Sequence, residues 1–112
     1  MIQLPLRPIE FQILLILADK ESHGYSIIQE TKKRTGGRVR LQPGTLYRAI
    51  QRLEDAGLIR ESVARPSRES DDQRRRYFAL TEEGRSVAAD EARRLADLVR
   101  ESRDAGLIEG TS

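Results

Sequence analysis

The chain has 112 residues, with 38% hydrophobic and 4% aromatic residues, no cysteine and one histidine, His23. This composition suits one small domain with an aliphatic core, and it excludes disulfide bridges, zinc–thiolate sites and multi-histidine metal centres. The sequence shows no nucleophile–base pair and no phosphate-binding loop, so we expect no enzyme activity, no catalytic residue, no metal and no cofactor.

The net charge of +2 hides an uneven distribution along the chain. Residues 1–80 contain 15 Lys and Arg against 10 Asp and Glu, a balance of +5, whereas residues 81–112 contain 5 against 8, a balance of −3. A basic front part and an acidic end favour a polyanionic partner for the front part, such as nucleic acid. An ordinary solvated surface is the alternative interpretation of the charge alone.

No stretch of the sequence approaches the roughly 18 apolar residues of a membrane span. The longest apolar run covers only residues 13–18, and the first five residues show no basic leader followed by an apolar block. We therefore expect no membrane partner, and the lack of cysteine fits a cytoplasmic location.

The first two predicted helices have clear sequence signals. Residues 8–18 begin with Pro8, which suits the first helical position, and they carry apolar residues on two faces, one for the core and one for a partner subunit. Residues 23–35 follow Ser22, a good N-cap because its hydroxyl can accept a free backbone N–H. Two glycines at 36–37 end this second helix.

A third helix is predicted to start at Pro43. It follows an extended link over residues 38–41, for which a small strand is the alternative. Leu46, Ile50 and Leu53 provide its apolar seam at positions i, i+4 and i+7, and its opposite face is polar.

Two strands and a last helix follow. Residues 58–64 and 74–80 have the residue types of strands, and residues 65–73 between them form a flexible polar loop. The last helix has Thr81 as its N-cap and runs to about residue 103. The apolar stripe on this charged helix consists of Val87, Ala88, Ala92, Leu95, Leu98 and Val99.

This order of elements predicts a mainly α fold with a β-hairpin, of the α+β class. The second and third helices are closely connected and a hairpin follows at once, which is the arrangement of a winged helix-turn-helix. The third helix can then lie in the major groove of DNA, which admits an α-helix, with its positive N-terminal end near a phosphate. We expect residues 1–80 to form the DNA-binding domain, 81–105 a dimerisation helix and 106–112 a flexible tail.

Five stretches in this order resemble the short subfamily of PadR transcriptional regulators, over roughly residues 4–100. They are Pro8-Ile9-Glu10, His23-Gly24-Tyr25-Ser26-Ile27, Pro43-Gly44-Thr45-Leu46-Tyr47-Arg48, Arg52-Leu53-Glu54-Asp55-Ala56-Gly57-Leu58-Ile59 and Arg74-Arg75-Arg76-Tyr77-Phe78-Ala79-Leu80-Thr81-Glu82-Glu83-Gly84. The resemblance implies a homodimer that binds double-stranded DNA at a palindromic operator, usually as a repressor. It also implies that a small hydrophobic or phenolic effector could release the operator.

The predicted base-reading residues lie at the start of the third helix. Thr45 and Arg48 lie opposite the apolar seam, with Gln42 just before them, and an arginine can pair with guanine through two hydrogen bonds. The resemblance implies a DNA contact for Tyr47; packing beneath the wing is the alternative. The predicted DNA-contacting set is Gln42, Gly44, Thr45, Tyr47, Arg48 and, in the wing, Arg68 and Arg74.

The dimer interface is predicted from the apolar stripe of the last helix. A lone charged helix of about 20 residues gains little stability by itself, so its apolar face needs a partner, and the first helix of the other subunit is the natural one. The predicted interface residues are Ile9, Ile13, Leu95, Leu98 and Val99.

Several other side chains have open interpretations. Arg52 pairs with Asp55 or Glu54, or else contacts DNA. The acidic residues of the predicted wing loop keep a second function in view, a winged-helix module that binds protein without reading DNA. A basic run that either lines the DNA backbone or forms a solvated face comprises Lys32, Lys33, Arg34, Arg38 and Arg40. The expected aromatic core residues are Tyr25, Tyr77 and Phe78.

Overall fold

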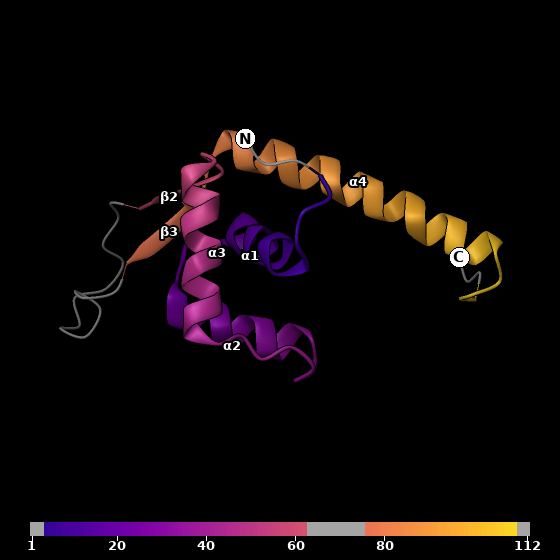
Figure 1. Cartoon of the computed structure of the whole chain (residues 1–112), viewed down its shortest axis with the longest axis horizontal. Coiled ribbons are helices and arrows are strands. Elements are labelled where there is room, and N and C mark those ends of the chain that lie inside the picture. Colours follow the sequence, from indigo (N-terminus) through magenta and orange to yellow (C-terminus); the bar gives the residue numbers. More distant parts are fainter. Residues whose placement is uncertain (1–3, 63–75, 110–112) are drawn as a thin grey trace.

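The computed structural model describes residues 4–62 and 76–109. Figure 1 shows three helices gathered beside a small sheet, with a fourth helix extending away from them. The elements in chain order are α1 (Pro8–Asp19), β1 (Ser22–His23), α2 (Gly24–Arg34), α3 (Pro43–Asp55), β2 (Ile59–Glu61), β3 (Tyr77–Leu80) and α4 (Glu82–Asp104). The predicted fold class, mainly α with a β-hairpin, is confirmed.

The three strands form one antiparallel sheet in the order β1-β3-β2. In the hairpin, Ile59 lies opposite Leu80, and on the other side of β3, Ser22 lies opposite Phe78. The sequence predicted β2 and β3 but not β1, because a strand of two residues has no period to detect. The link over residues 38–41 contains no strand, so the alternative of a small strand is wrong.

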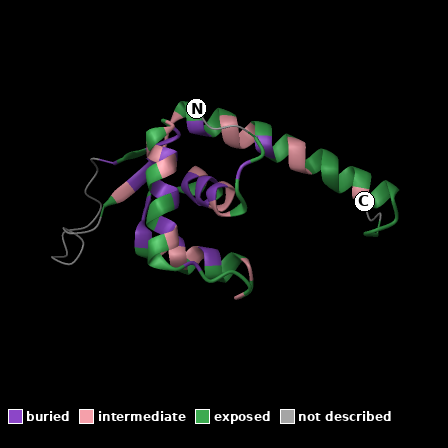
Figure 2. Cartoon of the chain, in the orientation of Figure 1, coloured by how far each residue is buried: buried purple, intermediate pink, exposed green. Residues whose placement is uncertain are grey.

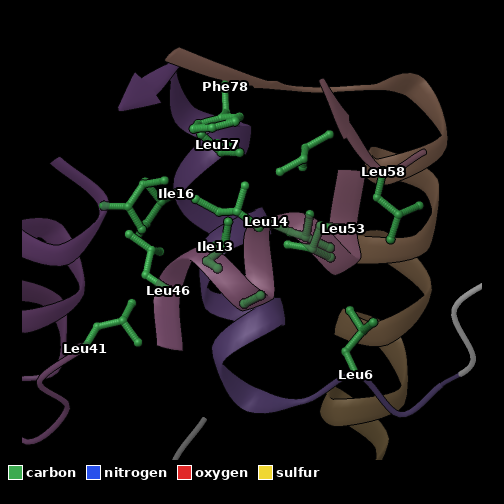
Figure 3. Packing of buried hydrophobic residues seen from close by; sticks show 14 residues of the cluster. Leu6, Ile13, Leu14, Ile16, Leu17, Leu41, Leu46, Leu53, Leu58 and Phe78 are labelled. Atoms are coloured by element: carbon green, nitrogen blue, oxygen red, sulfur yellow. The ribbon is translucent and has the colours of Figure 1, made fainter. Parts of the chain in front are cut away.

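The core lies where α1, α3 and β3 meet. The predicted seam of α3 is buried, with Leu46 and Leu53 at 0% exposure, and Phe78 of β3 is also fully buried. Figure 3 shows Phe78 next to Leu17 of α1, with Leu46 and Leu53 of α3 in the same cluster. Burial of these aliphatic side chains, each contributing about 1.5–3 kcal/mol, fixes the position of α3 against the rest of the domain.

The two predicted helix caps have different outcomes. Thr81 caps α4 as predicted, because its Oγ1 accepts the Gly84 N–H at 2.9 Å. The cap predicted at Ser22 is wrong: His23 caps α2, and its Nδ1 accepts the Ser26 N–H at 3.2 Å. Ser22 precedes the N-cap position by one residue and is paired in β1. Its hydroxyl donates to the Lys20 carbonyl instead.

One predicted core aromatic lies at the surface. Phe78 is buried as predicted and Tyr77 is half-buried, but Tyr25 is 58% exposed. The buried residues of α2 follow the spacing i, i+3, i+7, and Tyr25 falls outside that stripe. Its ring instead stacks beside that of His23, with 6.4 Å between centroids.

The start of α4 packs tightly against the hairpin. A Cβ at Gly84 would lie 2.0 Å from the Leu58 carbonyl oxygen, so only glycine fits at this point of the helix. Farther along, the inner half of α4 still packs against α1 and accepts the Leu6 N–H at Glu91. Figure 2 shows the outer half of α4 almost entirely exposed. In the described ranges, neither α4 nor another helix is long and apolar enough to cross a membrane.

Candidate nucleic-acid interface

The outward face of α3 brings most of the predicted DNA-contacting residues together. Gln42, Gly44, Tyr47 and Arg48 are all exposed near the N-terminal end of the helix, and Thr45 is half-buried beside them. The inward face is anchored in the core, so these side chains start from a fixed backbone. The residues predicted from the spacing therefore share one surface.

Arg48 is an exposed cation on this face. Its Nη2 lies 3.5 Å from the Thr45 hydroxyl oxygen, and a Cβ at Gly44 would lie 3.5 Å from its Nη1. Among the described residues, no carboxylate pairs with this guanidinium. Arg48 thus keeps its donors available for a partner outside the chain.

Tyr47 packs against the start of α2. A Cβ at Gly24 would lie 2.2 Å from the Tyr47 hydroxyl oxygen, so the absence of a side chain at Gly24 gives the phenol its place. Most of the predicted wing lies outside the described residues, so the packing of Tyr47 beneath it stays a prediction. Tyr47 is 46% exposed, and its hydroxyl lies near the positive end of a helix, where an anion is favoured.

Arg52 has a structural role with a partner that the sequence analysis missed. Its Nε donates to Glu10 Oε2 at 2.7 Å, and Glu10 Oε1 accepts the Arg7 N–H at 3.1 Å. The predicted partners, Asp55 and Glu54, are therefore wrong. Glu10 stands at the third position of α1, the capping-box position, and that signal could have identified its role.

At the base of the wing, Arg76 is engaged within the chain. Arg76 donates from Nε to Glu61 at 3.1 Å and from Nη2 to Glu54 at 3.3 Å, and its guanidinium lies 4.9 Å from the centre of the Phe78 ring. These contacts fasten the hairpin to α3. The predicted wing contacts Arg68 and Arg74 lie outside the described residues, and they stay predictions.

The basic run at the end of α2 divides into two kinds of residue. Arg34 pairs with Glu30 at 2.9 Å and with Asp19, and these hydrogen bonds, that to Glu30 foremost, hold the pKa of Arg34 above its usual value. Arg34 thus joins α2 to the end of α1. All five residues are exposed, and those for which no ion pair is found among the described residues are Lys32, Lys33, Arg38 and Arg40.

The predicted dimer residues are also divided by the structure. Ile13 is 0% exposed within a single chain, so it belongs to the core and the prediction of an interface role for it is wrong. Ile9 and Leu95 are half-buried, whereas Leu98 and Val99 are 43% and 44% exposed. The sequence showed that α1 is apolar on two faces, but not which face its own chain covers.

A buried carboxylate on α4 was not predicted. Glu91 is 1% exposed, and it accepts the Leu6 N–H at 3.0 Å and the Arg94 Nε–H at 2.7 Å. The hydrogen bond from Arg94 holds the pKa of Glu91 below its usual value of 4.5 against the opposing effect of burial. The spacing along α4 could have indicated this burial, because Glu91 lies four residues from both Val87 and Leu95, on the same face of the helix. Ala92, which was predicted to belong to the apolar stripe, is exposed.

Three packed helices, a hairpin directly after α3 and an outward basic face on α3 define the class of the molecule. It is a winged helix-turn-helix protein with an added long helix, and such proteins dock α3 into DNA.

The comparisons with known proteins identify the family. Residues 13–90 match the model of the transcriptional regulator PadR-like family, so the chain belongs to that family of regulators. It is 34% identical over 93 residues to the transcriptional regulator Rv3488 of Mycobacterium tuberculosis, covering 83% of this chain and 80% of that protein. A PadR family transcription regulator from Clostridium difficile superimposes with a TM-score of 0.69 at 27% identity, covering 89% of this chain and 98% of the other. A regulator from Clostridium thermocellum gives a TM-score of 0.71 at 25% identity, covering 87% of each chain.

Proposed function

We propose that this protein is a sequence-specific repressor that binds a palindromic operator as a homodimer. The observation that carries the proposal is Arg48, an exposed guanidinium without an ion-pair partner among the described residues, on the outward face of an α3 that is fixed by its buried seam. Arginine in this position can donate two hydrogen bonds to one guanine. The neighbouring Gln42 and Tyr47 add further donors on the same surface.

The proposal is tested by selecting bound sequences from random duplex DNA and then measuring affinity for the selected operator. Arg48→Ala should reduce discrimination at one base pair by about 1–3 kcal/mol, roughly 5- to 150-fold. Arg48→Lys is the matched variant, because it keeps the charge and loses the two parallel hydrogen bonds. A wild-type protein that binds all duplexes equally would overturn the proposal and favour a winged-helix module that binds protein.

The homodimer is inferred from apolar surface that a single chain leaves uncovered. Leu98 and Val99 are exposed on α4, and Leu15 on α1 is 38% exposed. With Ile13 assigned to the core, Leu15 becomes the α1 residue that can meet the α4 stripe of a second copy. Covering such side chains gives about 25 cal/mol for each Å² of apolar surface removed from water.

Sedimentation equilibrium tests this dimer with a double variant, Leu98→Asp and Val99→Asp, which should be a monomer. Arg100→Asp is the matched control, since it lies about 200° around the helix from Leu98 at 100° per residue, and it should leave the dimer intact. A double variant that sediments like the wild type would contradict the proposed interface.

Three finer parts of the proposal have their own measurements. A symmetric dimer should protect half-sites about 10–10.5 base pairs apart, or a multiple of this spacing, in a footprint. Repression should appear as lower transcription in vitro when the operator overlaps a promoter. A planar aromatic or phenolic effector, titrated into the complex, should cause the protein to release the operator. Titrations that cause no release would overturn the proposed effector.

A further inference from the structure

A surface hollow of about 360 Å³ lies between the start of α1 and the outward face of α3. It is lined by Arg7, Pro8, Ile9, Thr45, Arg48 and Arg52. Arg52 is held by Glu10, but Arg7 and Arg48 are exposed and have no carboxylate partner among the described residues. Three guanidinium groups against one buried carboxylate give the hollow a formal charge of +2.

The backbone at Arg7 is fastened at two successive amides. The Arg7 N–H donates to Glu10 of α1 at 3.1 Å, and the Leu6 N–H donates to Glu91 of α4 at 3.0 Å. Both carboxylates are buried, at 4% and 1% exposure. Figure 1 shows the described start of the chain passing from α4 to the start of α1. The Arg7 side chain therefore starts from a fixed position beside α3.

We propose that Arg7 binds a backbone phosphate of the operator, next to the base pairs that Arg48 reads. The inference rests on the proposed function, because the other rim of the hollow consists of Thr45 and Arg48. The hollow consequently opens on the same side of α3 as the predicted base-reading residues. A phosphate contact of this kind positions the protein on the duplex and carries no sequence information.

The occupant is a DNA phosphate rather than a free anion. Exposed guanidinium groups bind a separate anion weakly, because water screens the attraction. When α3 already holds a duplex, the neighbouring phosphate is present beside Arg7 at a high effective concentration. The same weak attraction is then sufficient for Arg7 to bind that phosphate. Arg7 thus adds, at the start of α1, a DNA contact that a model with only α3 and the wing would omit.

The experiment compares Arg7→Ala with Arg85→Ala in the full chain, on the selected operator and on a non-specific duplex. Arg85 is an exposed arginine of α4 outside the hollow and serves as the matched control. Arg7→Ala should weaken binding to both duplexes by a similar factor, about 5- to 10-fold at moderate salt. It should also reduce the slope of log K against log salt by about 0.9 for each subunit, and Arg7→Lys should retain most of that slope.

The two proposals fail in different ways. If Arg7→Ala has wild-type operator affinity and a wild-type salt slope, the phosphate contact is overturned. The proposed function still stands in that case if Arg48→Ala loses discrimination between base pairs. If the wild type discriminates between no duplexes, the proposed function itself is overturned. Saturable binding of inorganic phosphate at constant ionic strength, lost in Arg7→Ala while operator affinity stays at the wild-type value, would show a free-anion site and overturn the operator contact.

Discussion

The part of the molecule around α3 and the outer half of α4 are both helical, but they are stabilised differently. In the first part, side chains such as Leu46 and Phe78 are fully buried within one chain. In residues 95–104, Leu98 and Val99 stay exposed, and Figure 2 shows almost no buried surface there. The first part therefore carries its own core, whereas the outer half of α4 lacks apolar burial within the single chain and depends there on its helix propensity.

The two regions are connected by the inner half of α4. Thr81 caps the helix and donates to the Gly57 carbonyl at 2.7 Å, and Glu91 holds the Leu6 amide. Substitutions at these positions should lower the free energy of unfolding by less than substitutions in the core and by more than substitutions in the outer half of α4. A series of substitutions along α4 therefore measures where the self-supporting part of the chain ends.

The largest effect should come from Phe78→Ala, which creates a cavity in a fully buried site. Such substitutions cost about 3–5 kcal/mol, and the comparison variant Leu98→Ala should cost well under 1 kcal/mol at a protein concentration where the chain is a monomer. Urea unfolding followed by circular dichroism measures both. Equal losses in the two variants would contradict the division into a self-supporting part and a dependent helix.

The next effect concerns Glu91, whose pKa is lowered in the folded state. A lowered pKa stabilises the fold above the unfolded value of 4.5, and that stabilisation is lost as the pH falls toward the folded pKa. Glu91→Gln keeps an acceptor for Leu6 but removes the charge, so it should cost about 1 kcal/mol at neutral pH.

The measurement is urea unfolding at a series of pH values. The curves of Glu91→Gln and the wild type should converge below pH 4.5, whereas Glu101→Gln, at an exposed position of α4, should follow the wild type throughout. A constant difference between Glu91→Gln and the wild type at every pH would show that the carboxylate charge has no role.

Local patterns predicted the parts of the fold that depend on near neighbours. The seam of α3 and the Thr81 cap follow from residues within two helical turns, and both are confirmed. Long-range contacts were missed, because a single sequence does not show which distant residues meet. Glu10 and Arg52 are 42 residues apart, and Leu6 and Glu91 are 85 apart.

The candidate site shows the same limit. The spacing along α3 placed Thr45 and Arg48 on one surface, because a helix fixes residues three apart on the same side. Arg7 lies in a different element and reaches that surface only through the packing of α1 against α3. The dimer residue Ile13 was wrong for the related reason that periodicity identifies an apolar face but not what covers it.

A smaller effect should come from Thr81, at the junction of the two regions. Thr81→Ala removes the acceptor for the Gly84 N–H and the donor to Gly57, and the loss of such a cap costs about 0.5–2 kcal/mol. Thr81→Ser keeps the hydroxyl and should recover most of this free energy in thermal unfolding. If serine were as destabilising as alanine, the methyl group rather than the cap would be responsible.

The smallest effect should be found at Arg93, next to Arg94 on α4. Arg93 pairs with Asp90, but the two side chains are 71% and 54% exposed, and exposed pairs contribute about 0–1 kcal/mol. Arg94 instead holds the buried Glu91, so Arg94→Ala should destabilise the fold more than Arg93→Ala does. Raising the salt concentration should remove the small cost of Arg93→Ala and leave most of the cost of Arg94→Ala, because screening acts mainly on exposed charges. Equal costs at the two adjacent arginines would mean that the ion pair of Arg94 with the buried Glu91 stabilises the fold no more than an exposed pair does.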